Sequence, residues 1–207
     1  RMSAVVRTSN WASNQDGEYL VAKGAPEVME GLMEVDVVAY RKWVDHFASE
    51  GYRILALGLR RLSKGEGTNG DRGHYERQLE FVGFLVLTNE LKTDTREYIG
   101  RLKAAGRRTI ILTGDHLLTS MKAFEDINER ETTDRQFVIV DWSDGMVARS
   151  FKREESFRST SLQELESLRA SNAIIGVNGS SFDHILNFDE RVLLLFDVVA
   201  RVSPKQK

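Results

Sequence analysis

One segment in the second half of the sequence constrains the fold more than any other. An apolar run at residues 110–112 ends directly in Thr113, Gly114 and Asp115, and a helical pattern begins near Leu117. This pattern predicts a buried parallel strand that presents a hydroxyl, a glycine and a carboxylate at its carboxyl end. The hydroxyl and nearby backbone N–H groups can bind an anion there, and the glycine lets the backbone approach it closely. Three residues also recur by chance, so a capped turn without a ligand is the alternative.

The first 88 residues predict a mixture of antiparallel strands and helices. Asp16 and Gly17 form the dipeptide that is typical of a tight hairpin turn between two strands. Pro26 is suited to the first position of a helix, and Gly51 to the position just after the end of another. We therefore expect an α+β unit at residues 1–88.

The pattern then changes to helices that alternate with apolar strands. Asp94 and Ser161 are each followed three residues later by a glutamate, which is the capping-box signature of a helix start. The first of these helices is expected to bury a stripe formed by Tyr98, Ile99 and Leu102. A strand at residues 109–112 follows it. Alternation at this spacing predicts a parallel sheet with helices on both faces, so we expect a doubly wound α/β unit at residues 89–207.

The composition argues against several classes of protein. Lys and Arg number 29 and Asp and Glu 31, so the formal net charge is −2, and no basic excess points to a nucleic acid partner. The chain has no cysteine and its 4 histidines are scattered, which argues against disulfides and against thiolate or histidine metal centres. No apolar run approaches the roughly 18–20 residues that a membrane span needs. Because Arg1 precedes the first methionine and no closing element ends the sequence, we expect a fragment of a longer protein.

Two basic side chains in the first unit are candidates for binding a nucleotide. Lys23 leaves a strand end beside Gly24, where its charge can meet a phosphate or its stem can pack on a base. An exposed surface lysine without a ligand is the alternative. Arg53 lies on an otherwise apolar strand and therefore needs an anionic partner, which can be a carboxylate as well as a phosphate.

Two further cations follow the last strand of the second unit. Arg201 and Lys207 stand on either side of Pro204. If this strand end lies beside Thr113 in a parallel sheet, the two cations and the hydroxyl form a clamp for a phosphate group. Taken alone, the same residues are an ordinary basic tail.

Five motifs in a fixed order resemble one protein family. They read KGAPE, GYRILALGLR, FVGFLVL followed by LKTDTRE, TGDHLLT and ARVSPKQK. In this order they resemble the cytosolic region of the P-type ATPases, and the resemblance covers nearly the whole chain. The details are most similar to type V, and there to the endoplasmic-reticulum branch more than to the endolysosomal polyamine branch. These details are SPKQK, LKTDT, the Leu-Thr after TGD, and the segment Asn178-Gly179-Ser180.

The resemblance implies a fold and a division of roles. Residues 1–88 would be a partial nucleotide-binding (N) domain. Residues 89–207 would be a partial phosphorylation (P) domain with a Rossmann-like α/β fold of the haloacid dehalogenase type, and the chain would be truncated at both ends. The implied nucleotide-binding residues are Lys23, Gly24, Arg53, Gly114 and Arg201. The implied catalytic residues are Thr113, Asp115 and Lys207, which would hold and neutralise the transferred phosphoryl group, as positional and electrostatic catalysis of phosphoryl transfer requires.

Parts of the family's site are absent from this sequence. The aspartate of DKTGT, which is phosphorylated in the family, is missing, and so is the later GDGxND motif, whose carboxylates bind Mg²⁺. ATP and Mg²⁺ are thus the implied cofactors of the parent protein, with the Mg²⁺ ligands outside this chain. His116 stands where the family usually has Asn after TGD.

The resemblance also implies what the parent protein does. It would hydrolyse ATP through an aspartyl phosphate to drive transport at the endoplasmic reticulum membrane, with mistargeted transmembrane helices as cargo. The membrane and actuator domains of the same parent chain would be partners, and the chain alone would be inactive. Two alternatives stay open: a stand-alone haloacid dehalogenase-like phosphatase, which needs an aspartate nucleophile ahead of Thr113, and a noncatalytic nucleotide- or partner-binding module.

Overall fold

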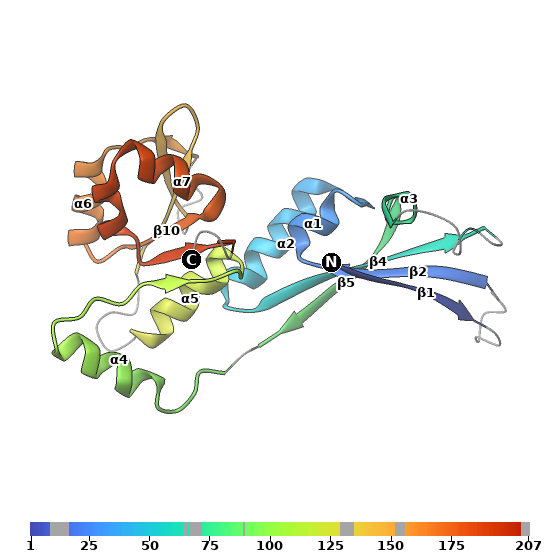
Figure 1. The fold of residues 1–207 in the computed structure, drawn as a ribbon, viewed down its shortest axis with the longest axis horizontal. Coiled ribbons are helices and arrows are strands. Elements are labelled where there is room, and N and C mark those ends of the chain that lie inside the picture. The colour runs from blue at the N-terminus through green and yellow to red at the C-terminus, as the bar shows by residue number, and fades with distance from the viewer. Residues whose placement is uncertain are drawn as a thin grey trace. The chain divides into compact units, whose positions relative to one another are not determined.

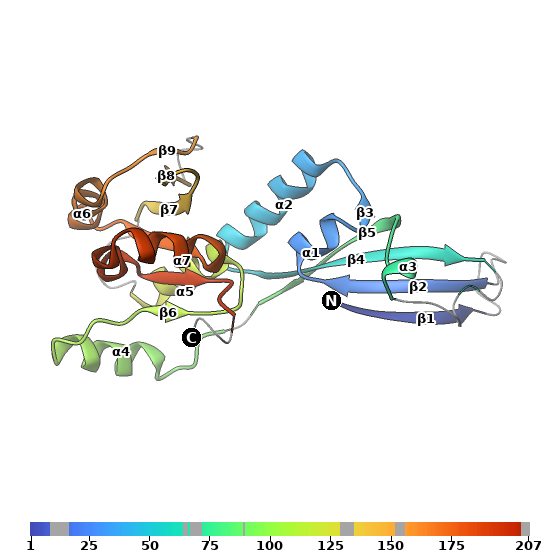
Figure 2. The same cartoon turned by 45° about the horizontal axis from the view of Figure 1, so that its top comes forward.

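The chain forms two compact units in a computed structural model (Figures 1 and 2). The structure describes residues 1–8, 17–63, 66, 72–88, 90–128, 135–151 and 156–203. Unit 1 comprises Arg1–Phe47 and Tyr52–Leu87, and unit 2 comprises Ala48–Gly51 and Thr88–Lys207. Asp16 of the predicted hairpin turn, Pro204 and Lys207 lie outside the described residues.

Unit 1 is built on a mixed sheet. Its strands are β1 (Met2–Thr8), β2 (Gly17–Gly24), β3 (Met33–Glu34), β4 (Arg53–Leu62) and β5 (Leu79–Leu87). Its helices are α1 (Pro26–Glu30), α2 (Val37–Ser49) and α3 (Arg72–Tyr75). The strand order is β1-β2-β4-β5-β3, and every neighbouring pair is antiparallel except the parallel pair β3 and β5.

The two faces of this sheet differ because side chains alternate along each strand. On β4, Ile54 and Ala56 are buried, whereas Arg53 is exposed. Helices cover the buried face: the ring of Tyr40 on α2 lies 5.0 Å from the ring of Phe84 on β5, measured between centroids. The core of unit 1 therefore lies between this face and the helices. No described helix covers the opposite face, which we call the open face.

Local signals set the helix boundaries in unit 1 as the sequence predicts. Pro26 is the first residue of α1. Gly51 follows α2 with φ = 89°, a conformation that glycine adopts without steric cost. At the start of α2, Asp36 Oδ1 accepts hydrogen bonds from the N–H groups of Val38 and Ala39. Pro26 and Gly51 act only on residues that are close in sequence, which is why the sequence alone reveals them, whereas the cap at Asp36 is seen only in the structure.

Unit 2 contains a second mixed sheet. Its strands are β6 (Ile111–Leu112), β7 (Phe137–Trp142), β8 (Met146–Ser150), β9 (Arg158–Ser159), β10 (Ile174–Asn178) and β11 (Val198–Ala200). Its helices are α4 (Thr95–Ala104), α5 (Leu117–Ile127), α6 (Leu162–Ala170), α7 (Gly179–Phe188) and the 3-10 helix η2 (Glu190–Leu195). The strand order is β6-β11-β10-β7-β8-β9. The first four strands are parallel, as predicted, whereas β8 and β9 add an antiparallel edge that the alternating pattern does not predict.

Helices cover both faces of the four parallel strands. On β10, a methyl group added at Gly176 would lie 2.8 Å from Leu117 Cδ1, so α5 packs directly against this side. The neighbouring Val177 belongs to the hydrophobic cluster of the other side, together with Phe182 and Ile185 of α7. The prediction of a parallel sheet between helices is therefore confirmed for this part of the chain (Figure 2). Among the described helices, none is both long and apolar enough to cross a membrane.

Two predictions for the beginning of unit 2 are wrong. The apolar run is not a buried strand, because β6 has only two residues and Ile110 and Leu112 are 38% and 49% exposed. The physical reason is that β6 is the edge of the described sheet and pairs only with β11. The predicted stripe on α4 is not buried either: Tyr98 and Leu102 are 56% and 44% exposed, and no residue of α4 is buried.

The two predicted capping boxes behave differently. Ser161 has an extended backbone, and its Oγ accepts a hydrogen bond from the N–H of Glu164 at 3.2 Å at the start of α6. Asp94 precedes α4 with a helical backbone, φ = −92° and ψ = −10°, and makes no side-chain cap bond. A capping side chain reaches the free N–H groups from an extended backbone, so only the box at Ser161 is confirmed.

Candidate functional site

The Thr113 loop (residues 113–115) follows β6 at the carboxyl edge of the parallel strands. The N–H of Asp115 donates a hydrogen bond to Thr113 Oγ1 at 3.0 Å. Main-chain bonds tie Thr113 to the segment of β11: its N–H donates to Val199 O at 3.0 Å, and its carbonyl accepts from the N–H of Val202 at 3.1 Å. These bonds fix the hydroxyl at the sheet edge. Because Oγ1 acts as the acceptor in the bond with Asp115, its proton can be donated to an incoming anion.

Arg201 stands directly after β11 and reaches the same loop. Its Nη1 donates a hydrogen bond to Gly114 O at 3.2 Å. Its backbone has φ = 55°, which is uncommon for a residue with a side chain and is often found at binding sites. A methyl group added at Gly114 would meet no described atom within 4 Å, so the space beside this glycine is open. The structure thus brings together four of the predicted site residues: Thr113, Gly114, Asp115 and Arg201.

The helix after the loop begins with a histidine cap. His116 is the N-cap of α5, and its Nδ1 accepts a hydrogen bond from the N–H of Leu118 at 3.3 Å. Nδ1 carries no proton when it accepts this bond. His116 therefore supplies the acceptor that Asn, Asp or Ser most often supplies at this position.

Sequence reasoning misses a fixed carboxylate at the same edge. Asp141 lies near the carboxyl end of β7, and its Oδ1 accepts hydrogen bonds from the hydroxyl of Ser181 and from the N–H of Trp142. The signal that finds Thr113 could have found Asp141 as well, because both are polar residues directly after an apolar run.

Lys23 and Arg53 lie on the same face of the unit 1 sheet. Lys23 stands opposite Leu57 in the register of β2 and β4, and Arg53 lies four residues before Leu57 on β4. Because residues two apart on a strand share a face, Lys23 and Arg53 both belong to the open face, about 13 Å apart along the strands. Both are exposed, and the half-buried Leu55 and Leu57 lie between them.

Gly24 belongs to the other side of this sheet. A methyl group added there would lie 3.0 Å from Arg1 Cβ and 3.2 Å from Met29 Cγ. Packing is therefore a sufficient reason for glycine at this position, and a nucleotide-binding role for Gly24 stays a prediction.

The predicted residues form two groups in two units, and Lys207 lies outside the described residues. The described part of the chain contains no group of three or more His, Asp or Glu side chains that could hold a metal ion.

Curated relatives match the chain, although no family model does. The cation-transporting ATPase catp-5 of Caenorhabditis elegans is 27% identical over 100% of the chain, and the polyamine-transporting ATPase 13A3 of Homo sapiens is 26% identical over 100%. The endoplasmic reticulum transmembrane helix translocase of Saccharomyces cerevisiae is 32% identical over 60% of the chain. The chain is a relative of the type V P-type ATPases.

The type V relatives are much longer than this chain. The chain covers 19% of the nematode and human proteins and 10% of the yeast translocase, so it spans at most about a fifth of the relatives named here. The resemblance based on five motifs is confirmed at the level of the family. Both transporters and helix translocases of the type V family match, so these similarities do not separate its two branches.

Proposed function

We propose that the chain is the nucleotide-binding and phosphorylation region of a type V P-type ATPase. In this proposal, residues 1–88 belong to the N domain, and residues 89–207 to a P domain with a Rossmann-like fold of the haloacid dehalogenase type. The observation that carries the proposal is the Thr113 loop, which Arg201 contacts at the carboxyl edge of parallel strands. Open α/β sheets bind their ligands at this edge.

The Thr113 loop would act on a phosphoryl group by position and charge. Thr113 Oγ1 accepts its bond from Asp115, so the hydroxyl proton can point to a phosphoryl oxygen. Arg201 and Lys207 would balance the negative charge of the group, and the open space at Gly114 would admit it. Donors that are already in place stabilise the charge on a transferring phosphoryl group.

The open face of unit 1 would bind the nucleotide. The stem of Lys23 would pack against the base, and Arg53 would pair with the phosphates. Leu55 and Leu57 lie between the two cations and are half-buried, so they add apolar surface to the same face. A few polar groups around an apolar surface are typical of small-molecule sites.

The parent protein would supply the rest of the reaction. The phosphorylated aspartate and the carboxylates that bind Mg²⁺ belong to motifs that this sequence lacks. Mg²⁺ bound in the parent would neutralise charge on the phosphates. We predict that the chain alone releases phosphate from ATP no faster than its Lys207→Ala variant. If the chain released phosphate at a steady-state rate clearly above that of the variant, the proposal that the parent supplies the remaining catalytic groups would be contradicted.

A titration with a nonhydrolysable ATP analogue tests the nucleotide site. Lys23→Ala and Arg53→Gln should each raise the dissociation constant about tenfold, because each removes one charged contact. Lys42→Ala is the matched control, since Lys42 is an exposed lysine on α2 and not on the open face. Equal affinities of the wild type and all three variants would overturn the nucleotide-binding proposal.

For the parent we propose ATP-driven transport at the endoplasmic reticulum, with transmembrane helices as cargo and this region on the cytosolic face. It is supported by the helix translocases of two yeasts, which match 91% and 60% of the chain. Polyamine transport is the second candidate, because polyamine-transporting ATPases match the whole chain.

The ATPase rate of the full-length parent separates the two candidates. It would be measured with spermine and, separately, with a detergent-solubilised transmembrane peptide. Stimulation by the peptide alone supports helix translocation. Stimulation by spermine alone rejects it and favours polyamine transport.

A further inference from the structure

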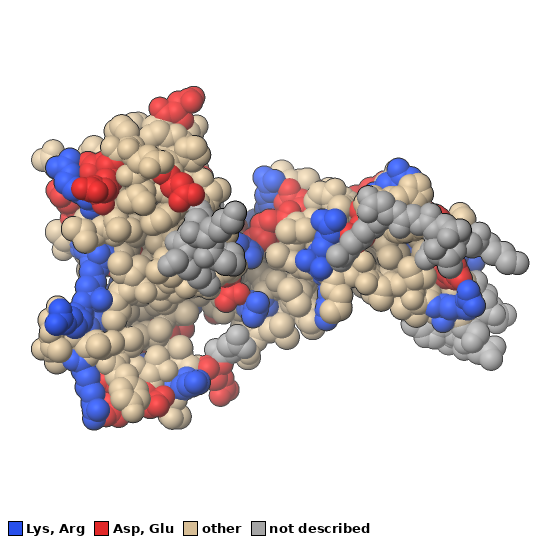
Figure 3. Space-filling view, in the orientation of Figure 1, with Lys and Arg blue, Asp and Glu red and all other residues tan. Residues whose placement is uncertain are grey.

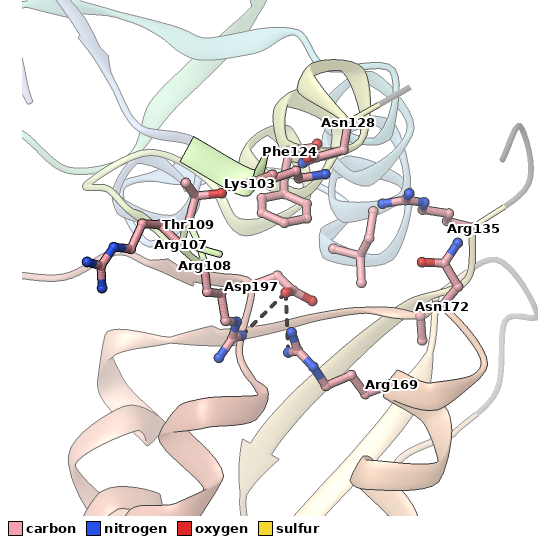
Figure 4. Close-up of a pocket in the computed structure, with 12 residues that line it drawn as sticks. Lys103, Arg107, Arg108, Thr109, Phe124, Asn128, Arg135, Arg169, Asn172 and Asp197 are labelled. Atoms are coloured by element: carbon pink, nitrogen blue, oxygen red, sulfur yellow. Dashed lines mark hydrogen bonds and ion pairs between the residues drawn. The ribbon is translucent and has the colours of Figure 1, made fainter. Parts of the chain in front are cut away.

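A cavity lies at the amino edge of the unit 2 sheet, where the parallel strands begin. It has a volume of about 290 Å³ and is lined by the ends of α4, α5 and α6 and the starts of β6, β10 and β11 (Figure 4). The Thr113 loop stands at the opposite, carboxyl edge of the same strands. The charged residues that line the cavity are Lys103, Arg107, Arg108, Arg135, Arg169 and Asp197. Five cations therefore surround one carboxylate.

Two of these cations share that carboxylate. Arg108 and Arg169 both pair with Asp197, and a guanidinium nitrogen of each lies 3.4 Å from Asp197 Oδ1 (Figure 4). Asp197 Oδ2 accepts a hydrogen bond from the N–H of Ile175 at 3.1 Å. Burial, together with the charge of Arg169, holds the pKa of Arg108 below its usual value. Two guanidinium groups therefore face one carboxylate, which leaves one positive charge unbalanced beside Asp197.

Structural roles account for part of the positive charge. Arg108 donates hydrogen bonds to the carbonyls of Leu194 and Phe196, and Arg169 donates to the carbonyl of Leu195 at 2.7 Å. Both arginines therefore hold the end of η2 in place. The negative ends of the helix dipoles of α4, α5 and α6 also favour cations here.

Those roles do not involve Lys103 or Arg107. In the part of the chain that the structure describes, Lys103 and Arg107 have no ion-pair partner. Arg107 extends outward from the cavity, and Arg135 enters from the far side with only 7% exposure (Figure 4). Lys and Arg side chains gather along this side of unit 2, between α6 and α4 (Figure 3). The cations are thus concentrated at one place on the unit.

A buried acceptor in the cavity also lacks a partner. Asn128 lines the cavity and is 5% exposed. Its amide nitrogen donates to Phe124 O, whereas its Oδ1 has no hydrogen-bond partner among the described residues. A buried acceptor without a partner costs free energy unless a donor reaches it. A ligand with a hydroxyl group would supply that donor.

We propose that this cavity binds a small, hydroxylated ligand that carries phosphate, such as a sugar phosphate. The phosphate would take the charge that Asp197 leaves unbalanced, since guanidinium and ammonium groups donate strong hydrogen bonds to phosphate oxygens. A hydroxyl of the ligand would donate to Asn128 Oδ1. The side chains of Phe124 and Ile174 would pack against its carbon skeleton. The volume of about 290 Å³ is just below the range of most ligand pockets, roughly 300–1,000 Å³, and therefore suits a small ligand.

Titration of the whole chain with fructose bisphosphate, followed by amide chemical shifts, tests the proposal. We expect shifts at Thr109, Asn128 and Asn172 and none at Gly114 of the Thr113 loop. Fructose without phosphate should cause no shift. Shifts confined to the Thr113 loop, or no shift at millimolar fructose bisphosphate, would overturn the proposal. Because the readout is local, it is independent of whether the nucleotide proposal holds.

Charge-removing variants add a second test. Lys103→Ala should raise the dissociation constant of fructose bisphosphate about tenfold, and Asn128→Ala should raise it as well. Arg158→Gln is the matched control, because Arg158 is 64% exposed on β9 and does not line the cavity. Equal weakening in the control would show that overall charge, and not the cavity, binds the ligand.

A lipid headgroup can present the same phosphate group as a free sugar phosphate. Sedimentation with vesicles distinguishes these two sources of phosphate. The vesicles contain phosphatidylcholine with or without phosphatidylinositol phosphate. The proposal expects free fructose bisphosphate to bind and the two kinds of vesicle to behave alike. Binding only to the phosphoinositide vesicles would overturn it in favour of a membrane surface.

Discussion

Two glycines of unit 2 differ in what a side chain would meet. Around Gly114, a methyl group would meet no described atom within 4 Å. At Gly176, it would lie 2.8 Å from Leu117 Cδ1 and 2.9 Å from Met121 Sδ, against two side chains of α5. Gly176 is therefore required for packing, whereas nothing in the described residues requires glycine at position 114 unless a ligand approaches it.

Alanine at each glycine separates these two roles. Gly176→Ala should lower the free energy of unfolding by about 1–3 kcal/mol, because the core under α5 is overpacked. Gly114→Ala should change it by less than about 0.5 kcal/mol, yet weaken the binding of a phosphate analogue to the Thr113 loop. Urea unfolding and a titration would measure the two quantities. Unchanged binding in Gly114→Ala would argue against a ligand at this glycine.

His116 offers a second prediction at the residue scale. Asn is a better N-cap than most residues, so His116→Asn should raise the free energy of unfolding, and His116→Ala should lower it by about 0.5–2 kcal/mol. Thermal unfolding of the two variants would be compared with that of the wild type. Equal stability of His116→Ala and the wild type would mean that the bond from the N–H of Leu118 contributes nothing.

At the scale of elements, the sequence predicts helix boundaries correctly, because they depend on neighbouring residues. It does not predict the burial of α4 and β6, because burial depends on residues far away in the sequence. Gly51 and Pro26 mark helix boundaries correctly because each acts within its own helix turn. The burial of Tyr98 and Leu102 depends on what packs against α4, which the sequence of α4 does not specify. Leu112 is exposed for a similar reason, because burial of β6 needs neighbours on both sides and the described sheet has only β11.

The two capping boxes lead to opposite expectations. Ser161→Ala should lower the free energy of unfolding by about 0.5–2 kcal/mol, because the N–H of Glu164 loses its acceptor. Asp94→Ala should have little effect on stability, since Asp94 makes no side-chain cap bond. Denaturant unfolding of both variants is the measurement. A larger loss for Asp94→Ala than for Ser161→Ala would contradict the observed cap geometry.

At the scale of the whole molecule, the two sites differ in how far the sequence reveals them. The Thr113 loop is predictable because its residues are consecutive and follow an apolar run. The cavity at the amino edge of the unit 2 sheet is not predictable, because its residues run from Lys103 to Asp197 and meet only where several strands begin and helices end. Lys23 and Arg53 are an intermediate case. The sequence predicts each residue as a candidate, but that they share a face follows only from the register of β2 and β4.

The central claim is that the open face of unit 1 and the Thr113 loop of unit 2 both bind parts of a nucleotide. Amide chemical shifts during titration with a nonhydrolysable ATP analogue test it most directly, because they report every site at once. We predict shifts at Lys23, Arg53 and Gly114, and a dissociation constant about tenfold higher, read from the shift at Arg53, in the Lys23→Ala variant. Shifts confined to the amino-edge cavity around Arg108, with Lys23 and Gly114 unmoved, would contradict the account.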